Sequence, residues 1–476
     1  MTALAVREGA GIAECLASLV DDRPRDGRLA AATVAVPAVD PVSLYAVAAE
    51  AGHEAALWLQ PSGAMAFVGI GRAWAVEAEG ADRFQVAEAA WRGLVADAAL
   101  HRADDAALGG PVLLGAMGFT GRRPDADDAW GPFGPSSMVL PELLYAVDGE
   151  RATVTASLVG GGAADERVLE RRWQDLATHA RATAPNPAGL VARPVFAPLT
   201  IASEQPGPDA WRRLVGMFAG AVGRGRLDKV VLARRVDLRS PVELDVPNAL
   251  RRLAASAPES TSYAFRRGGR TFLGATPERL ARTDGRRFRT VAVAGTIGRG
   301  ADAAEDDRLG EALLASEKDR EEHAIVLAAI RDELAPLADE LIVSPQPEVM
   351  RLRFVQHLVT EISGTLPDAN GLLALAQRLH PTPAVGGEPR ELALSLVDEH
   401  EGFDRGWYAG PVGWLGTDGD GELCVALRCG IVDRTRATLF AGCGIVADSD
   451  PEREWEESRI KLRAVISALG IPEDGS

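Results

Sequence analysis

The sequence has few cysteines and an excess of acidic over basic residues. Four of its 476 residues are cysteine, and none forms a CxxC pair or has histidines at zinc-finger spacing. This pattern argues against a zinc site and suits a reducing cytoplasm. The formal net charge of -17 argues against a nucleic-acid or anionic-membrane partner, because a surface of phosphates would repel the chain.

Long apolar runs are also absent. No stretch approaches the ~18 apolar residues that a membrane helix requires. Near the amino terminus, Glu14, Asp21 and Asp22 stand where a secretory peptide needs an apolar core. We therefore expect a soluble, cytoplasmic protein that does not enter a membrane.

What the chain does contain is enough apolar material for a large globular core, with 47% hydrophobic and 25% charged residues. Strand-like segments, one of them at 350–364, are often separated by short glycine turns that are typical of hairpins. These turns fall at Asp148-Gly149, Gly268-Gly269, Asp284-Gly285 and 417–422, and helices are expected at 163–183, 306–333 and from Pro451 onward. This order favours an α+β fold with large antiparallel sheets over a doubly wound parallel sheet.

One apolar strand, "LDKVVLARRV" at 227–236, contains a lysine. With an alternation of period two, Lys229 shares a face with Val231 and Ala233, so a strand that faces the core carries an ammonium group inward. A buried lysine must be paired, neutralised or used in chemistry. We therefore treat Lys229 as a candidate functional residue.

Two of the predicted helices carry carboxylates three residues apart, Asp319 with Glu322 and Glu454 with Glu457. This spacing places each pair on one helix face. Charged helix faces are usually solvated, but the second helix directly follows the glycine-rich segment "GCGIVADSDP", which indicates the rim of a pocket. If Glu322 and Glu457 converge, they require a cation between them, and oxygen ligands without Cys or His indicate Mg²⁺.

Positive groups and glycines flank the second acidic helix. Arg428 in "ALRCG" can form a two-pronged contact with a carboxylate, and Lys461 follows Glu457 by one turn. The glycines of "FAGCG" expose backbone N–H groups. Taken alone, Arg428 is better explained by an ion pair at a strand edge. Together, these groups predict a site for an anionic ligand beside the metal.

Nine segments together resemble the chorismate-utilising enzyme family, which includes isochorismate synthases, salicylate synthases and anthranilate synthase large subunits (component I). They are "KVVLARR", "FLGATPERL", "VAVAGTIGRG", "SEKDREEHAIV", "VQHLVTEISG", "LHPTPAVGG", "GWYAGPVGW", "ALRCGIV" and "LFAGCGIVADSDPEREWEESRIKL". The resemblance implies one α+β unit of stacked large antiparallel sheets flanked by helices. In it, an N-terminal portion, residues 1–200, is interwoven with a chorismate-binding catalytic portion, residues 201–470. The proline-rich stretch from Pro185 to Pro208 is then a surface connection.

The resemblance also implies roles for individual residues. Lys229 is implied as the catalytic base and Glu278 as the general acid, whereas Glu278 after Pro277 taken alone is typical of the first turn of a helix. His357 is equally well explained as a satisfied core histidine. The implied Mg²⁺ ligands are Glu322 and Glu457, with Glu454 and Asp319 near the metal or its waters, and the implied substrate-binding residues are Gly295, Thr296, His357, Arg428, Gly442, Gly444 and Lys461.

Within this family, the nucleophile that attacks the ring decides the reaction. Lys229 matches the base of the branch that adds water at C2, and Ala294 stands where one aminodeoxychorismate synthase subtype has a nucleophilic lysine. The resemblance therefore implies an isochorismate synthase that acts on chorismate as a monomer, without an obligate amidotransferase partner. The alternatives are a salicylate synthase, an ammonia-dependent anthranilate-type synthase and a non-catalytic chorismate-binding subunit. Menaquinone and siderophore biosynthesis both remain open as the destination of the product.

Overall fold

The structure is a computed structural model that describes residues 11–20, 27–63, 65–103, 109–125, 128–160, 166–184, 198–367 and 371–470. Most of the proline-rich stretch from Pro185 to Pro208 lies outside these residues, as do Asp21 and Asp22. Within the described part, no helix is both long and apolar enough to cross a membrane.

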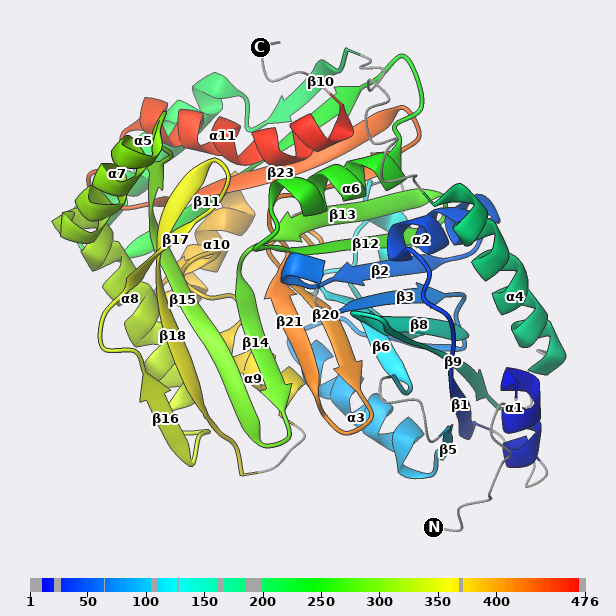
Figure 1. Ribbon diagram of the computed structural model, residues 1–476. Coiled ribbons are helices and arrows are strands. Elements are labelled where there is room, and N and C mark those ends of the chain that lie inside the picture. Colours follow the sequence, from blue (N-terminus) through cyan, green and yellow to red (C-terminus); the bar gives the residue numbers. More distant parts are fainter. Residues whose placement is uncertain are drawn as a thin grey trace.

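Two large sheets form the centre of the molecule (Figure 1). In spatial order, the strands of the larger sheet are β10 (Thr200–Gln205), β11 (Lys229–Arg239), β23 (Arg436–Ile445), β22 (Cys429–Asp433), β13 (Arg270–Thr276), β12 (Thr261–Arg267), β2 (Ala55–Leu59), β3 (Ala66–Ile70), β8 (Leu143–Asp148), β9 (Arg151–Val159), β1 (Leu29–Ala35) and β5 (Ala99–Arg102), with the short β19 (Gly387–Glu388) beside β11.

The smaller sheet is ordered β16 (Glu340–Val343), β18 (Val355–Thr365), β15 (Arg287–Gly298), β14 (Arg279–Asp284), β21 (Gly421–Val425), β20 (Pro411–Gly416), β6 (Val112–Met117), β7 (Ser136–Leu140) and β4 (Trp74–Glu77), with β17 (Glu348–Arg351) beside β18. Among the described strand pairs, only β1 with β5 is parallel. The predicted α+β fold with large antiparallel sheets is therefore confirmed.

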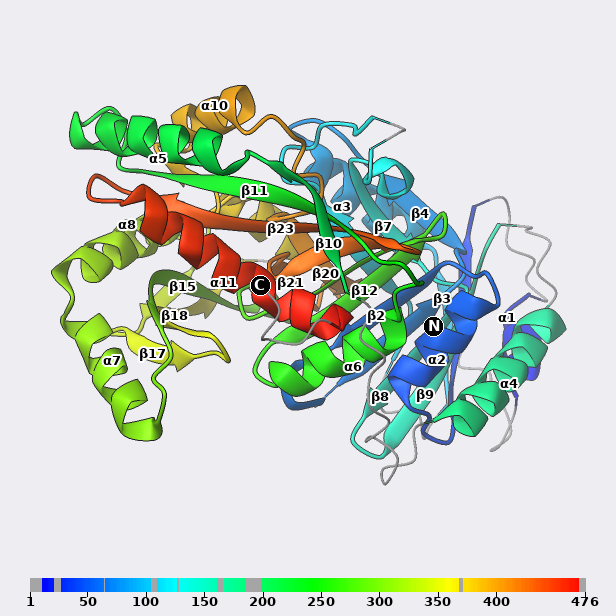
Figure 2. The same cartoon turned by 90° about the horizontal axis from the view of Figure 1, so that it is seen from above.

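Helices cover the outer faces of the sheets. They are α1 (Ile12–Val20), α2 (Pro41–Glu50), α3 (Arg83–Ala96), α4 (Glu166–Thr183), α5 (Pro208–Gly223), α6 (Val246–Ser256), α7 (Ala303–Ala315), α8 (Glu317–Leu334), α9 (Leu372–Leu379), α10 (Arg390–His400) and α11 (Pro451–Leu469), with 3-10 turns at Pro61–Gly63 and Gly131–Phe133. Figure 2 shows α11 lying along β23, and α5 and α10 beside β11.

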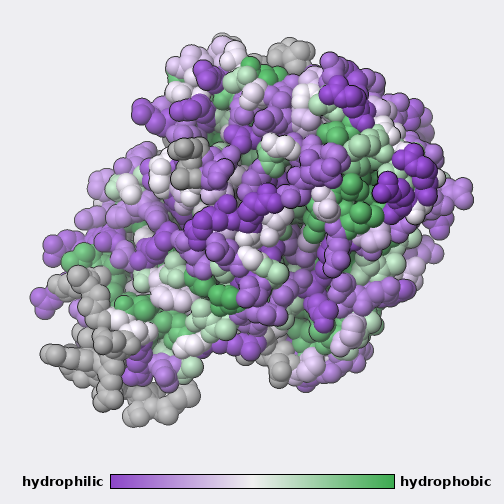
Figure 3. Space-filling model, turned by 180° about the vertical axis from the view of Figure 1, so that it is seen from behind, coloured by the Kyte–Doolittle hydropathy of each residue, from purple (hydrophilic) through white to green (hydrophobic). Residues whose placement is uncertain are grey.

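The two sheets pack face to face through apolar side chains. Phe67 on β3 of the larger sheet meets Trp414 on β20 of the smaller sheet edge-on, with ring centroids 5.2 Å apart. Trp58 and Leu114 belong to the same buried cluster. The surface seen from behind is largely hydrophilic, with apolar patches between the polar side chains (Figure 3). Strands from both halves of the sequence share each sheet, since β2 pairs with β12 and β6 with β20.

Two local predictions were wrong. The single helix expected at 306–333 is divided into α7 and α8 at Ser316, whose extended backbone ends one helix and whose side chain accepts a hydrogen bond from Asp319 N at the start of the next. The single strand expected at 350–364 is instead a hairpin of β17 and β18, closed by a hydrogen bond from Leu352 N to Val355 O. The expected end helix is confirmed, and Asp450 caps it.

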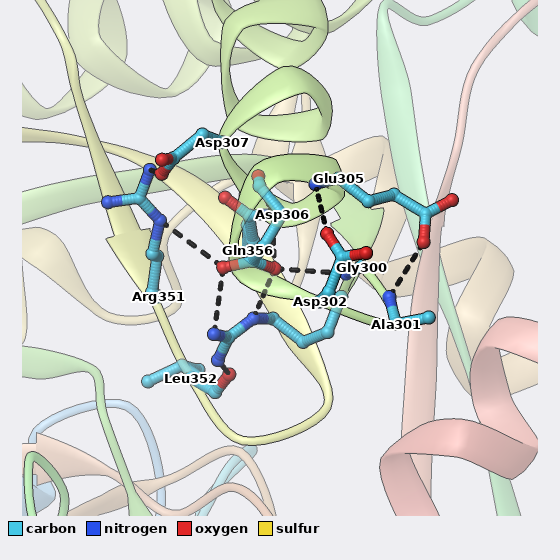
Figure 4. A network of polar contacts seen from close by, with 10 residues as sticks. Gly300, Ala301, Asp302, Glu305, Asp306, Asp307, Arg351, Leu352 and Gln356 are labelled. Carbon is cyan, nitrogen blue, oxygen red and sulfur yellow. Dashed lines mark hydrogen bonds and ion pairs between the residues drawn. The ribbon is translucent and has the colours of Figure 1, made fainter.

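The loop between β15 and α7 is fixed by one buried carboxylate, that of Asp306 (Figure 4). It accepts hydrogen bonds from Arg299 Nε at 2.6 Å, from Gly300 N at 3.0 Å and from Gln356 Nε2 at 3.0 Å. Asp302 caps α7 by accepting from Glu305 N at 2.9 Å. The hydrogen bonds from Arg299 and Gly300 lower the pKa of Asp306 to about 2.

This network predicts how stability depends on Asp306. Because its pKa lies below the ordinary 3.8, the ionised carboxylate stabilises the fold above pH 3.8, and this contribution is lost as the pH falls toward about 2. Asp306→Asn should therefore lower the Tm at pH 7, and the difference from the wild type should shrink in acid. Asp307→Asn is the control, because exposed Asp307 contacts only Arg351 in this network. Equal Tm losses in the two variants at pH 7 would contradict the prediction.

Candidate active site

One cavity of about 120 Å³ collects the residues that the sequence had singled out. Strands β11, β15, β18 and β23 and helices α8 and α11 all contribute side chains to it. The thirteen predicted site residues that line it are Lys229, Glu278, Gly295, Thr296, Asp319, Glu322, His357, Arg428, Gly442, Gly444, Glu454, Glu457 and Lys461. Their individual roles stay predictions, but their convergence on one cavity is a property of the fold.

Lys229 is buried and paired. Its side chain is 2% exposed, and Nζ donates a hydrogen bond to Glu322 Oε1 at 2.7 Å. The neighbouring strand makes room for this pair at Gly444, where an added Cβ would lie 2.5 Å from Lys229 Cε and 3.0 Å from Glu322 Oε1. The glycine therefore shapes the space that the amine occupies.

Glu278 lies between β13 and β14, so its interpretation as a residue of a first helical turn was wrong. Its backbone N–H donates to Thr276 Oγ1 at 3.2 Å, and its side chain is buried. Burial raises the pKa of Glu278 to about 7, although Lys229, Arg428 and Lys461 oppose this shift. A carboxyl group with this pKa can donate a proton near neutral pH.

Arg428 enters the cavity from the turn between β21 and β22. Its φ of 47° is in the left-handed region, which a residue with a Cβ adopts at a cost. Its backbone carbonyl accepts a hydrogen bond from Ala275 N at 3.2 Å. Burial lowers the pKa of Arg428, and Glu457 opposes that shift, so the guanidinium remains a half-buried cation suited to a carboxylate.

The start of α11 supplies two carboxylates and an ammonium group. Burial and the neighbouring Glu457 raise the pKa of Glu454 to about 7. Burial acts in the same direction on Glu457, but Lys461, at a contact of 2.5 Å, together with Arg428 and Lys318 outweighs it and lowers the pKa of Glu457. Lys461 Nζ also donates to Gly442 O at 2.9 Å. The acidic pair is therefore only partly compensated by the residues around it.

This donor set fits Mg²⁺. Carboxylate oxygens of Glu454 and Glu457 and the sulfur of Cys443 lie within 4.8 Å of one another. Burial raises the pKa of the Cys443 thiol well above its ordinary value, and Sγ donates to Glu454 O at 3.2 Å, so oxygen atoms are the available ligands. Glu322 lines the same cavity, but its Oε1 contacts Lys229.

A bulge in β15 shapes another wall of the cavity. The register with β18 shifts between Ala294 and Thr296, and Gly295 at this point has a φ of 77°. His357 Nδ1 lies 3.2 Å from Gly295 O and 3.0 Å from Thr296 Oγ1. Burial and the nearby Arg428 lower the pKa of His357 to about 3. The imidazole is therefore neutral, and Nδ1 carries its proton because a carbonyl oxygen can only accept.

Some lining residues were not predicted. Lys318 and Tyr408 line the cavity, as do the apolar Val231 and Val385. Lys318 directly precedes Asp319, whose carboxylate accepts a hydrogen bond from Ser316 Oγ at 2.5 Å. Both Lys318 and Tyr408 lie inside the segments that carried the family resemblance, and that resemblance is the sequence signal that could have pointed to them as site residues.

Comparison with known proteins extends the family resemblance over most of the chain. The family model "Chorismate binding enzyme" matches residues 14–470. The chain is 38% identical over 452 residues to the salicylate biosynthesis isochorismate synthase of Pseudomonas aeruginosa, which covers 94% of this chain and 91% of that protein. The chain therefore belongs to the chorismate-binding enzyme family.

Solved structures agree with this assignment. The menaquinone-specific isochorismate synthase MenF of Escherichia coli superposes with a TM-score of 0.75 at 28% identity, covering 96% of this chain and 99% of that one. Anthranilate synthase component I of Streptococcus pneumoniae shares the fold, with a TM-score of 0.64 at 20% identity over 97% of this chain and 100% of that one. The predicted family and its fold are confirmed.

Gly444→Ala tests the space around Lys229. The added methyl group meets the flexible end of the lysine rather than backbone, so it should displace the amine and leave the fold intact. We expect a loss of turnover of about 10-fold or more, since a displacement of ~1 Å can cost about 100-fold, with a Tm close to that of the wild type. Gly216→Ala is the control, because no atom lies within 4 Å of its added Cβ. Full turnover in Gly444→Ala would contradict this assignment.

Proposed function

We propose that the protein is an isochorismate synthase, which converts chorismate to isochorismate. The observation that carries this proposal is the presence of a buried lysine and a buried carboxyl group with a pKa near 7 in one cavity that also holds Arg428 and Lys461. The last two are cations suited to the carboxylates of chorismate. Two related proteins with isochorismate synthase in their names support the same activity.

The reaction adds a water oxygen at C2, moves the ring double bonds and releases the C4 hydroxyl group. Lys229, in its neutral form, accepts a proton from the attacking water. Glu278 gives its proton to the departing C4 oxygen, which leaves as water. Atoms balance, because one water enters and one leaves. Each proton transfer of this kind contributes about 10²- to 10⁴-fold to the rate.

The substrate-binding groups orient the ring between the acid and the base. We assign Arg428, Lys461 and the backbone at Gly295, Gly442 and Gly444 to the carboxylates of chorismate. Neutral His357 and Thr296 form the wall beside them. This wall and the apolar side chains of Val231 and Val385 limit the water in the cavity.

Mg²⁺ is the proposed cofactor. Glu322 and Glu457 would hold it, with Glu454 and Asp319 in support, and it would supply positive charge for a carboxylate of the substrate. Glu322 has two carboxylate oxygens, of which Oε1 contacts Lys229. A cation at this place would also relieve the repulsion that Glu457 exerts on Glu454.

A salicylate synthase is the second candidate, because the same acid and base would first form isochorismate.

The small Ala294 in the cavity wall argues against covalent capture of the ring by a lysine at this place, as in one subtype of aminodeoxychorismate synthase. We further propose that the chain acts without an amidotransferase subunit, since water is the nucleophile that Lys229 serves.

Product analysis tests these alternatives directly. The purified chain should convert chorismate to isochorismate in the presence of Mg²⁺, and EDTA should abolish the conversion. NMR of the products, with and without ammonium, distinguishes the outcomes. Salicylate with pyruvate would identify a salicylate synthase, anthranilate that depends on ammonium would identify an anthranilate-type enzyme, and unchanged chorismate would indicate a binding subunit.

The pH profile tests the acid and the base. Glu278 is protonated below its pKa of about 7, so kcat/KM should decline as the pH rises through 7. Glu278→Gln should lower kcat by about 10²- to 10⁴-fold and remove this decline. In Lys229→Ala, kcat should fall by a similar factor, while chorismate binding should stay measurable by calorimetry. Full activity of the lysine variant would remove Lys229 from the mechanism.

A further inference from the structure

Strand β11 lacks a neighbouring strand along part of one edge. On one side it pairs with β23 from Val230 to Arg239. On the other side, β19 pairs only with Lys229 and Val230, and β10 pairs only from Arg235 onward. Residues 231–234 therefore have no strand partner on this side among the described residues, although Val231 N donates to Gly386 O at 3.0 Å. The interrupted stretch begins two residues after the proposed base.

A buried ion pair fills this gap. Ala233 N donates to Glu401 Oε1 at 2.7 Å, and Arg405 Nη2 donates to Val231 O at 2.7 Å. Arg405 Nε donates to Glu401 Oε2 at 2.8 Å. Both side chains are 3% exposed. The two side chains supply hydrogen bonds that a neighbouring strand would otherwise supply.

The same guanidinium reaches another wall of the cavity. Arg405 Nη1 donates to Val385 O at 2.8 Å, and both Val385 and Val231 line the cavity. The Arg405 guanidinium lies 4.4 Å from the centre of the Phe119 ring. The backbone carbonyl of Arg405 accepts a hydrogen bond from Tyr408 N at 2.9 Å. One residue therefore connects the strand of Lys229 with the segments that carry Val385 and Tyr408.

We propose that Glu401 and Arg405 are positioning residues for the reaction, which hold β11 and the Val385 wall so that Lys229 faces the substrate. This inference rests on the proposed function, because that function gives Lys229 its role. A buried ion pair is seldom more stabilising than apolar residues of the same volume, so stability alone does not explain this pair. Small displacements of a catalytic group cost rate far more than they cost binding.

Two conservative variants test the proposal. Arg405→Lys keeps the charge but cannot donate to Glu401, Val231 and Val385 in the same geometry, and Glu401→Gln keeps the shape but loses the charge. Each should lower kcat by about 10- to 100-fold. KM for chorismate should stay within about threefold, because Arg428 and Lys461 lie on other elements. Hydrogen exchange of the Ala233 amide, which donates to Glu401, should be faster in both variants.

Arg83→Lys is the matched control. Arg83 is 7% exposed and donates to the carbonyls of Gly80, Gly118 and Phe119, none of which lines the cavity. It should lower the Tm but leave kcat unchanged. Unchanged kcat in folded Arg405→Lys and Glu401→Gln, or an equal loss of kcat in the Arg83 variant, would overturn the proposal. If the wild type does not convert chorismate, the proposed function fails, while unchanged amide exchange in the variants would separately refute the holding of β11.

Discussion

Charge compensation inside one cavity is the constraint on which this site depends. Five carboxyl groups line the cavity, those of Glu278, Asp319, Glu322, Glu454 and Glu457, together with four basic groups, Lys229, Lys318, Arg428 and Lys461. Water screens the buried members, Lys229, Glu278 and Glu454, less than it would at a surface. Two close pairs, Lys229 with Glu322 and Lys461 with Glu457, therefore set the arrangement of the others. A substrate with two carboxylates and a divalent cation would add equal and opposite charge, so the balance would survive their joint binding.

The fold supplies this arrangement through small residues and interruptions of regular structure. Gly444 leaves space for the Lys229 amine, and the bulge at Gly295 exposes a carbonyl that fixes the His357 ring. Arg428 reaches the cavity only because its backbone adopts a left-handed conformation. Departures from ideal sheet geometry thus lie where the polar groups converge, as expected when a site constrains the backbone.

The sequence indicated the parts of the site that depend on local periodicity. Alternation along β11 predicted that Lys229 faces inward, and a spacing of three residues predicted that Glu454 and Glu457 share a helix face. Ser316 shows where this approach failed, because a helical pattern continues through the residue that caps the second helix. The contact between Ala233 and Glu401 spans 168 residues, and no local pattern encodes it. Likewise, the environment of Glu278 depends on burial by segments distant in sequence.

Strand β11 shows the desolvation cost that accompanies buried charged groups at the site. Four buried charged groups lie on it or against it: Lys229 pairs with Glu322, Arg234 pairs with Glu204, Glu401 accepts from Ala233 N, and Arg405 donates to Val231 O. Apolar side chains fill the space around an ordinary buried strand at lower desolvation cost. In the proposed function, Lys229 meets the substrate inside the cavity and cannot be replaced in this way, so the strand that carries it is held without a complete neighbour. The cost of burying the Glu401–Arg405 pair therefore follows from the place of the lysine, because the gap in the sheet edge beside the Val385 wall leaves residues 231–234, just after Lys229, without a strand neighbour on that side.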